Sequence, residues 1–459
     1  MARNAITNNK GLSMTASNPA AIPAQLHRPT NVRWRILAVL IVLSFVSYLL
    51  RGNLSIAAPS MMADLHLSEI QWGWVMSAFP LGYALFQFPG GVFGERFGPR
   101  KTLAFISMSW AVLIVITSLL PGADVASTSL VLGSLMVVQF LVGAAHAPIF
   151  PVVAASIGRW FPVGGWGFPN GLSSSGLTFG LAATASALPW LMSMVGWRNS
   201  FVILAPFGFA SAALWWWYAR DIPAQHKSTN EAEVALITAG RSTAEIAAVA
   251  EVVPGALPAW RRVLKNRDLL LVTLSYACMN FVFYVVFSWG FYYLVTLRGF
   301  AEQEAGFLTS GQWLGAGLGA ALGGFASDKL CHRIGLRWGC RGPIVFSMLV
   351  SAALLLGVAF HPNAYAAAIM LGLCFFFNQA TEGPYWQTCT AVGGRHAGAA
   401  GGMMNAGANF MGFINAILLA VVADKVGWTA AIAIGAGFAV VGAGLIFLVR
   451  ADCQIDQAA

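Results

Sequence analysis

Three ionisable side chains, Arg51, His146 and Glu382, lie within long apolar stretches of the sequence. A charged group at the centre of a bilayer costs about 2.5–3.5 kcal/mol on insertion scales, so such residues usually face a wet cavity and bind a partner. Arg51 stands in SYLLRGNLSIAAP and needs a charged or polar partner. An imidazole can take up a proton near physiological pH, and a buried carboxyl can also carry one. The three residues therefore indicate a polar site inside a membrane.

The two proton-exchanging residues each have a structural alternative. His146, in the middle of an apolar run, could instead be a neutral histidine hydrogen-bonded between helices. Glu382 lies in NQATEGPYWQT, where Gly383 and Pro384 can break a helix and free backbone groups. It would then serve either as a proton carrier or counter-ion to Arg51, or as a carboxylate that packs two helices together.

Uncharged polar residues recur at helical spacing near these positions. Tyr83 and Gln87 are one helical turn apart, as are Asn405 and Asn409, and Tyr48 precedes Arg51 by three residues. Such pairs can donate to carboxylate and hydroxyl groups of a ligand, or can join helices. Further candidates come from NFVFYVVFSWGFYYL and from the run before Glu382, where an aromatic stripe could equally face lipid or core: Asn280, Tyr284, Trp289, Asn378 and Gln379.

The elements that must position these residues are membrane-spanning helices. Of the 459 residues, 58% are hydrophobic and only 9% are charged, against about 25% charged in soluble domains. A spanning helix needs about 20 apolar residues. The sequence predicts an all-α membrane protein with twelve spans, at 34–58, 71–93, 101–121, 129–156, 168–195, 199–219, 269–296, 304–326, 343–361, 364–389, 398–424 and 428–449.

These spans divide into two sets of six around a polar segment. We expect a disordered cytoplasmic tail at 1–33, a six-helix bundle at 34–219, a cytoplasmic linker at 220–267, a second six-helix bundle at 268–450 and a short tail at 451–459. With both termini inside, 22 of the 26 Lys and Arg residues fall on cytoplasmic segments and three on outer loops. This distribution explains the net charge of +9 without a nucleic-acid partner.

An internal repeat supports the two bundles. GVFGERFGPRK at 91–101 follows the second span, and GFASDKLCHR at 324–333 follows the eighth. Both begin with Gly-x-x-x-acid-base, and they start 233 residues apart. Parallel repeats of this kind build transporters around a site at the membrane midplane.

The sequence resembles the major facilitator superfamily over roughly residues 30–450. GVFGERFGPRK is similar to the superfamily's signature in the second loop, with Glu95 where Asp is commoner. The resemblance implies a fold of two pseudo-symmetric six-helix bundles, which usually works as a monomer. It also assigns a gating role to the charged loops, through Gly91, Glu95, Arg96, Gly98, Arg100 and Lys101 and their counterparts Asp328 and Lys329.

A narrower resemblance, to the anion:cation symporter family, rests on YLLRGNLSIAAP, SAFPLGYALFQFPGGVFGERFGPR, GAAHAPIFP, NGLSSSG and GGMMNAGANFMG. That family includes bacterial sugar-acid transporters and animal sialic acid and vesicular glutamate carriers. It implies transport of small organic anions, often with protons, with Arg51 binding the substrate carboxylate in a central cavity. Together with the alanine-rich composition, it favours import across a bacterial inner membrane.

Three positions depart from the family pattern. Leu50 stands where many bacterial members have Asp, and QFLVGAAHAP places Gln139 and His146 where the family usually has Arg and Glu. The family's proton mechanism therefore does not transfer unchanged. We expect His146 to replace the missing glutamate, with Gln139 still lining the site. A single cavity arginine favours a substrate with one carboxylate and an aromatic or apolar body.

Other classes of function fit the sequence less well. A uniporter or exchanger of a monocarboxylate stays open because the usual carboxylates are missing. Drug exporters of the same superfamily usually carry a Gly-Pro-rich fifth span, whereas this one reads GLTFGLAATASALPWL. We expect no enzyme, since the spans contain no clustered catalytic set, and no cofactor or metal. The absence of G-x-x-x-x-G-K-[ST] argues against an ATP-driven pump.

Overall fold

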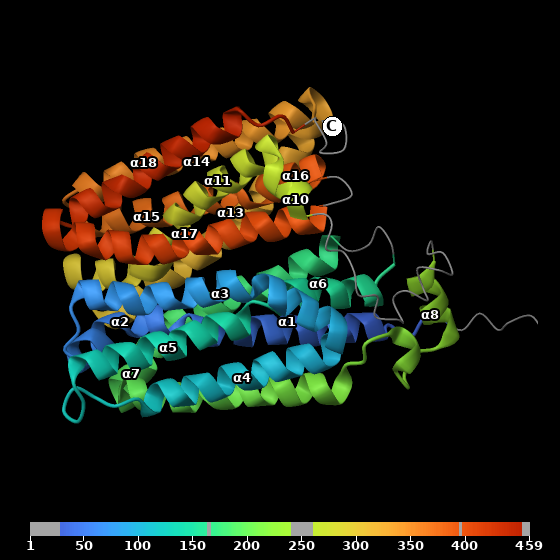
Figure 1. Cartoon of the computed structure of the whole chain (residues 1–459), viewed down its shortest axis with the longest axis horizontal. Coiled ribbons are helices and arrows are strands. Elements are labelled where there is room, and N and C mark those ends of the chain that lie inside the picture. The colour runs from blue at the N-terminus through green and yellow to red at the C-terminus, as the bar shows by residue number, and fades with distance from the viewer. Residues whose placement is uncertain (1–27, 163–166, 240–259, 394–396, 452–459) are drawn as a thin grey trace, which may run out of the picture.

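The computed structural model describes residues 28–162, 167–239, 260–393 and 397–451, and all regular elements within them are helices (Figure 1). The N-terminal half comprises α1 (Val32–Arg51), α2 (Asn53–Asp64), α3 (Glu69–Phe97), α4 (Pro99–Leu119), α5 (Thr128–His146), α6 (Ile149–Trp160) and α7 (Gly167–Tyr218). Three short helices follow: η1 (Pro223–Gln225), α8 (Glu231–Thr238) and α10 (Trp260–Lys265).

The C-terminal half begins with a helix that contains two wide turns. It runs through α11 (Arg267–Tyr284), the π-helical turn η3 (Val285–Trp289), α12 (Gly290–Tyr292) and the π-helical turn η4 (Tyr293–Leu297). The remaining elements are α13 (Glu302–Ile334), α14 (Leu336–Phe360), α15 (Ala364–Ala380), α16 (Glu382–Gly393), α17 (Ala397–Val426) and α18 (Trp428–Phe447).

The twelve predicted spans are confirmed. In the described part of the chain, nine helical segments are long and apolar enough to cross a membrane. One of them, Pro169–Tyr218, bends at Gly196 (φ 75°, outside the helical region) and makes two spans, where the sequence predicted 168–195 and 199–219. Helices α3 and α13, 29 and 33 residues long, complete the set.

The two halves lie side by side along the length of the molecule (Figure 1). Helix α3 packs against α17 and α7 packs against α13, so these four helices make the most extensive contacts between the halves. The end of the molecule that carries α8 and α10 is here named the linker end, and the opposite end, where α7 bends at Gly196, the far end.

The repeat seen in the sequence is also present in the backbone. Gly98 (φ 80°) and Gly335 (φ 84°) precede α4 and α14 at equivalent places in the two halves, in a conformation that side chains other than glycine rarely adopt. Close glycine contacts also recur. A Cβ on Gly143 of α5 would lie 2.0 Å from the Phe79 carbonyl oxygen of α3, and one on Gly323 of α13 would lie 1.9 Å from that of Ala380 of α15.

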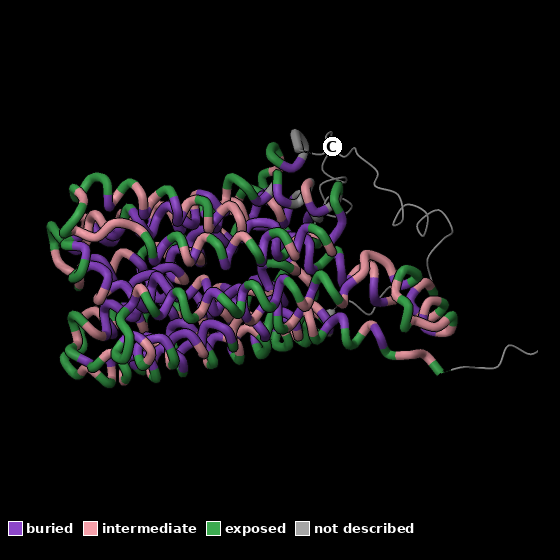
Figure 2. Tube along the Cα trace, turned by 90° about the horizontal axis from the view of Figure 1, so that it is seen from below, coloured by how far each residue is buried: buried purple, intermediate pink, exposed green. Residues whose placement is uncertain are grey.

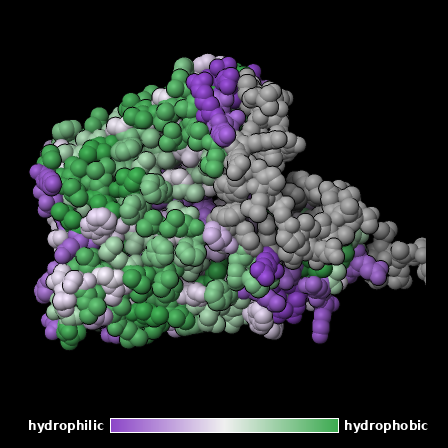
Figure 3. All heavy atoms as spheres, viewed as in Figure 1, coloured by the Kyte–Doolittle hydropathy of each residue, from purple (hydrophilic) through white to green (hydrophobic). Residues whose placement is uncertain are grey.

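The surface matches a bilayer environment. Apolar side chains cover the lengths of the helices, while hydrophilic residues gather toward the two ends (Figure 3). Large exposed side chains such as Phe105 and Leu318, each 62% exposed, point outward from the spans. Buried residues occupy the interior of each half (Figure 2). An apolar surface of this extent is stable only in contact with lipid. The protein is a multi-pass membrane protein.

Side chains join the two halves at the far end. Ser60 of α2 donates to Glu302 Oε1 of α13 at 2.9 Å. Glu69, at the start of α3, accepts from the Tyr292 hydroxyl at 2.6 Å and from Trp428 Nε1 at 3.3 Å. The far end is therefore closed by hydrogen bonds to two carboxylates.

At the linker end, the buried carboxylate of Glu233 on α8 caps the first turn of α1. It accepts from Thr30 Oγ1, from the Val32 and Arg33 amides (3.0 Å each) and from Arg33 Nη1 (3.2 Å). Burial alone would raise the pKa of Glu233, but these hydrogen bonds and the charge of Arg33 lower it below its ordinary value. The linker is thus attached to the helix that ends at Arg51.

Candidate functional site

Arg51 is the last residue of α1 and lies between the two halves. Its Nη1 donates to the Tyr48 hydroxyl at 2.9 Å, and its Nη2 lies 3.5 Å from the Tyr284 hydroxyl of the other half. No carboxylate of the described residues lies within 4.0 Å of it. Gly52 follows, where a Cβ would lie 3.0 Å from Leu181 of α7. The chain thus presents a partly buried cation held by neutral hydroxyl groups.

Aromatic rings surround the guanidinium. Its central carbon lies 4.6 Å from the ring centre of Phe79, 4.9 Å from Tyr48, 5.2 Å from Phe287 and 5.5 Å from Tyr83. Each such contact contributes about 0.5–2 kcal/mol, with the higher values in sites removed from water. The rings therefore offset part of the cost of burying the charge without neutralising it.

The C-terminal half continues this polar cluster through α11 and α17. The Tyr284 hydroxyl donates to Asn409 Oδ1 at 3.0 Å, and Asn409 Nδ2 donates to the Asn405 carbonyl oxygen at 2.9 Å. Gly412 makes the contact possible, because a Cβ there would lie 2.4 Å from the Tyr284 ring. Four sequence candidates, Arg51, Tyr48, Tyr284 and Asn409, therefore belong to one hydrogen-bonded network across the halves, with Asn405 at its end.

His146 is the final residue of α5, where Pro148 interrupts the helix before α6. Its Nδ1 lies 2.9 Å from the Val142 carbonyl oxygen and its Nε2 lies 3.2 Å from the Ser47 carbonyl oxygen. The ring stacks on Trp110 and meets the edge of Phe79, the same residue that covers Arg51. A neutral imidazole can donate to one carbonyl only, whereas a protonated imidazole can donate to both. Each ring nitrogen therefore has a carbonyl acceptor when the ring is protonated.

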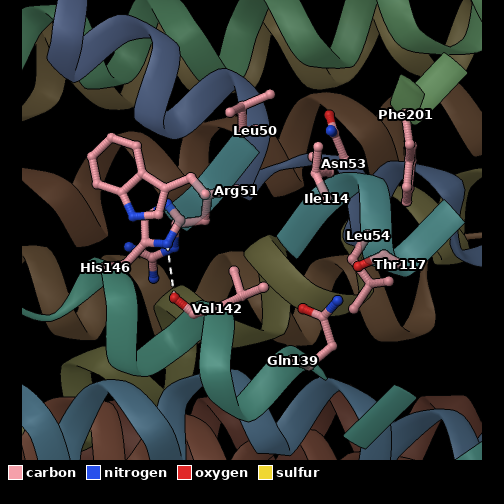
Figure 4. Close-up of a pocket in the computed structure, with 11 residues that line it drawn as sticks. Leu50, Arg51, Asn53, Leu54, Ile114, Thr117, Gln139, Val142, His146 and Phe201 are labelled. Carbon is pink, nitrogen blue, oxygen red and sulfur yellow. Dashed lines mark hydrogen bonds between the residues drawn. The ribbon is translucent and has the colours of Figure 1, made fainter. Parts of the chain in front are cut away.

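Gln139 lies in a separate small cavity with Arg51 and His146. The cavity, of about 20 Å³, is lined by Leu50, Arg51, Asn53, Leu54, Trp110, Ile114, Thr117, Gln139, Val142, His146 and Phe201 (Figure 4). All of these belong to the N-terminal half. The residue at the family's second arginine position thus faces the interior of one bundle together with Arg51.

Glu382 begins α16, where α15 ends at a break around Thr381. Its Oε1 accepts from the Tyr276 hydroxyl at 2.7 Å and from Trp386 Nε1 at 2.9 Å. A carboxylate at a helix N-terminus is also favoured by the helix dipole. Asn280 lies one turn from Tyr276 and donates to its carbonyl oxygen at 3.0 Å. Glu382 therefore forms a second cluster, in the C-terminal half, and makes no hydrogen bond or salt bridge with Arg51.

The other predicted polar residues have different surroundings. Tyr83 is buried beside Arg51, and Gln87, one turn further along α3, is 8% exposed. Asn378 is fully buried and donates to the Met279 carbonyl oxygen, so it joins α15 to α11. Its neighbour Gln379 is half-buried at the end of α15. Trp289 packs on Trp428 and Tyr292 toward the far end, away from the Arg51 cluster.

The loop residues predicted to act in gating lie at the linker end. The Arg100 amide donates to Asp221 at 2.8 Å, its guanidinium donates to the Trp216 carbonyl oxygen, and Arg96 stacks on Phe97. In the other half, Asp328 accepts from Gln387 at 3.1 Å. Lys101 is exposed, Gly98 begins α4 and Lys329 lies 6.0 Å from the Phe325 ring. The Gly91 and Glu95 side chains lie outside the described residues.

The sequence matches the profile of the Major Facilitator Superfamily over residues 40–414, which is most of the chain. The chain belongs to the Major Facilitator Superfamily. It is accordingly a membrane transporter and not an enzyme, as the sequence predicted.

Several similar proteins are named as transporters of organic acids. The chain is 30% identical over 398 residues to a protein of Cupriavidus necator named probable sulfoacetate transporter, covering 86% of this chain and 89% of that one. It is 29% identical to the hexuronate transporter of Bacillus subtilis, covering 88% and 92%. Among solved structures, a bacterial homologue of the human lysosomal transporter Spinster superposes with a TM-score of 0.70 at 16% identity, over 91% of this chain and 97% of that one.

The sequence did not identify several residues in and beside the site. Phe79 contacts both Arg51 and His146, and it lies four residues before Tyr83, so the helical spacing that selected Tyr83 could have found it. Beside the site, Asn53 lies two residues after Arg51 and lines the small cavity of the N-terminal half, outside the hydrogen-bonded network of Arg51. Phe287 had no such signal, because it belongs to a π-helical turn that α-helical spacing does not describe.

Proposed function

We propose that this transporter carries small organic anions, bound at Arg51, across the membrane by alternating access of its two halves. The observation that carries the proposal is Arg51 itself. It is a partly buried cation whose hydrogen-bond partners among the described residues are tyrosine hydroxyls from both halves. A ligand carboxylate or sulfonate would supply the missing charge and would contact both halves at once. The names of the relatives support the same class of substrate.

The surroundings of Arg51 favour a compact anion with one acidic group. Four aromatic rings lie near the guanidinium, while the position of the family's second arginine holds Gln139. A second carboxylate would therefore have a neutral amide, not a cation, nearby. We infer a monocarboxylate or sulfonate with an apolar or aromatic body, in preference to a sugar diacid.

We further propose that import is coupled to protons, with His146 as the coupling group. Its two carbonyl neighbours favour the protonated ring, and substrate charge at Arg51 would add to that effect. Glu382 is the second candidate for the coupling group, because it is a carboxylate within the C-terminal bundle, at the start of α16, and a carboxylate can take up a proton. Uniport or exchange of a monocarboxylate, and export from the cell, are the alternatives.

The proposed setting is a bacterial inner membrane with the linker end in the cytoplasm. The support is the concentration of Lys and Arg on the tail, the linker and the loops at that end. Reaction of cysteines introduced at the far end and at the linker end with an impermeant thiol reagent, in intact cells, tests this orientation.

The decisive experiment is uptake into proteoliposomes, with and without an inward proton gradient, over sugar acids, aromatic acids, short carboxylates and small sulfonates. We expect one acid to be concentrated only with the gradient. His146→Ala should abolish that concentration and leave exchange of labelled for unlabelled substrate. An acid that merely equilibrates in both conditions would contradict proton coupling but not anion transport. Uptake of no acid in the panel would contradict the proposed function itself.

A further inference from the structure

The small cavity inside the N-terminal half meets the interface between the halves at Arg51. All eleven residues that line it come from α1, α2, α4, α5 and α7 (Figure 4). Its volume of about 20 Å³ exceeds the roughly 10–15 Å³ that one water molecule requires, but is far too small for an organic acid. A ligand of this cavity must therefore be about the size of water.

The polar atoms in the cavity wall specify what that ligand is. Asn53 is 1% exposed, and neither its Nδ2 nor its Oδ1 has a hydrogen-bond partner among the residues that the structure describes. Arg51 Nε is also buried and unpaired. An unsatisfied buried polar group costs about 1–3 kcal/mol. Two of these atoms donate and one accepts, so an anion could not satisfy Asn53 Oδ1. Water can serve all three.

The cavity extends from the level of His146 toward the far end. His146 and Trp110 lie at its midplane side. Gln139, seven residues before His146 on α5, is about 10 Å nearer the far end. Thr117, near the end of α4, donates to the Leu113 carbonyl oxygen, so its hydroxyl oxygen can still accept a hydrogen bond from another group.

Beyond the cavity, polar contacts continue to the surface of the far end. The carbonyl oxygen of Ser118, next to Thr117, accepts from Arg198 Nη1 at 3.0 Å. Arg198 in turn pairs with the half-exposed Asp64 at 3.8 Å. Polar groups of the N-terminal half therefore extend from the far-end surface to the level of His146.

Resting on the proposed function, we propose that this cavity is an internal water site, hydrogen-bonded to Arg51 Nε and Asn53. His146 exchanges its proton with the far side of the membrane through this water when one ring nitrogen leaves the Val142 or Ser47 carbonyl oxygen. The charged and titratable side chains on the helices around His146 at this level are Arg51 and Tyr48 of α1 and Tyr83 of α3. The route lets His146 be loaded while the substrate pathway at the far end stays closed.

The first test needs no substrate. In lipid bilayers, proton-detected NMR of the full-length protein labelled with ¹⁵N-histidine measures magnetisation transfer from water to the imidazole rings. The protein has seven histidines, and the signal that disappears in His146→Gln is the signal of His146. We expect rapid transfer to His146 in the wild type and its loss in Asn53→Leu. Asn415→Leu, which removes a buried asparagine of α17 in the other half, should leave the transfer unchanged. No transfer in the wild type, or equal transfer in Asn53→Leu, overturns the water site.

The second test concerns coupling. Asn53→Leu proteoliposomes should exchange labelled substrate as the wild type does and lose concentration driven by the proton gradient, while Asn415→Leu keeps both. Retained concentration in Asn53→Leu overturns the proton route. If the wild type concentrates no acid, the proposed function fails, but the NMR measurement still decides on the water site.

Discussion

Arg51 is stabilised in the middle of the molecule by aromatic rings and hydroxyl groups, with no carboxylate of the described residues beside it. The planar guanidinium can face Phe79 and Phe287 while its edges donate to Tyr48 and to a ligand. A lysine ammonium would keep the charge but could not make both kinds of contact.

We therefore expect Arg51→Lys to weaken substrate binding and Arg51→Ala to weaken it further, by about 2–5 kcal/mol for loss of a buried charge-assisted pair. Titration calorimetry with the transported acid measures both. Arg198→Ala, at the far end and outside the cluster, is the matched control. Equal affinity in Arg51→Ala and wild type would exclude this residue as the anion site.

Glu382 has two donors on one oxygen, which suggests that it positions Tyr276 and Trp386. Glutamine keeps an oxygen that can accept both hydrogen bonds but cannot carry a proton. We expect Glu382→Gln to retain gradient-driven accumulation in proteoliposomes, whereas Glu382→Leu should lower the melting temperature. Loss of accumulation with intact exchange in Glu382→Gln would instead make this carboxyl the proton carrier.

At the level of single residues, the sequence identified those candidates whose helices are regular. Helical spacing grouped Tyr48 with Arg51 and Asn405 with Asn409, and these pairs do lie together. It could not separate Asn378, which bonds to the backbone of α11, from a cavity residue. A polar side chain in an apolar helix has the same sequence pattern in both situations, so only the packing of neighbouring helices distinguishes them.

Among the helices, the contact of α3 with α5 sets how close Phe79 and Tyr83 come to His146 and Arg51. It depends on Gly143, where a Cβ would lie 2.0 Å from a backbone oxygen. Gly143→Ala should cost about 1–3 kcal/mol through overpacking and should reduce substrate affinity. Thermal unfolding and binding measure the two effects. Gly133→Ala on the same helix, with open space around it, should change neither.

Helix α8 stabilises α1 through Glu233. The lowered pKa of this carboxyl means that its ionised form stabilises the folded state above the ordinary glutamate pKa of about 4.3, and that this contribution is lost as the pH falls through the lower folded value. Glu233→Gln should therefore melt at a lower temperature than wild type at pH 7, and the difference should shrink below about pH 4. The exposed Glu231, replaced by Gln, is the control. A difference independent of pH would contradict the assignment.

On the scale of the whole molecule, the hydrogen bonds of Glu69 and Glu302 must break for the far end to open. Glu69→Ala combined with Glu302→Ala should increase the population open at that end. Spin labels at the exposed Val125 and Phe360, one in each half, would show longer distances. Glu304→Ala is the matched control, because Glu304 accepts a hydrogen bond from Tyr365 within a single half. Unchanged distances in the double variant would show that these carboxylates do not hold the far end closed.

The overall fold was predictable because its signals are local. Span length, the break near Gly196 and the paired loops at 91–101 and 324–333 can each be read within one segment. The contacts between the halves could not be predicted in this way. Tyr292 and Trp428 gave no sign of meeting Glu69, since their partners depend on how two bundles dock and on which end is closed.

The two π-helical turns η3 and η4 indicate that this helix can tolerate the loss of a residue. Each wide turn holds about one residue more than an α-helical turn, so it corresponds to an inserted residue retained in the fold. A one-residue deletion within 285–289 could therefore be absorbed by conversion to a regular turn. The helix on either side of the turn would keep its orientation, and only the side chains within 285–289 would shift. Relatives that differ by one residue here would present a different side chain where this chain has Phe287.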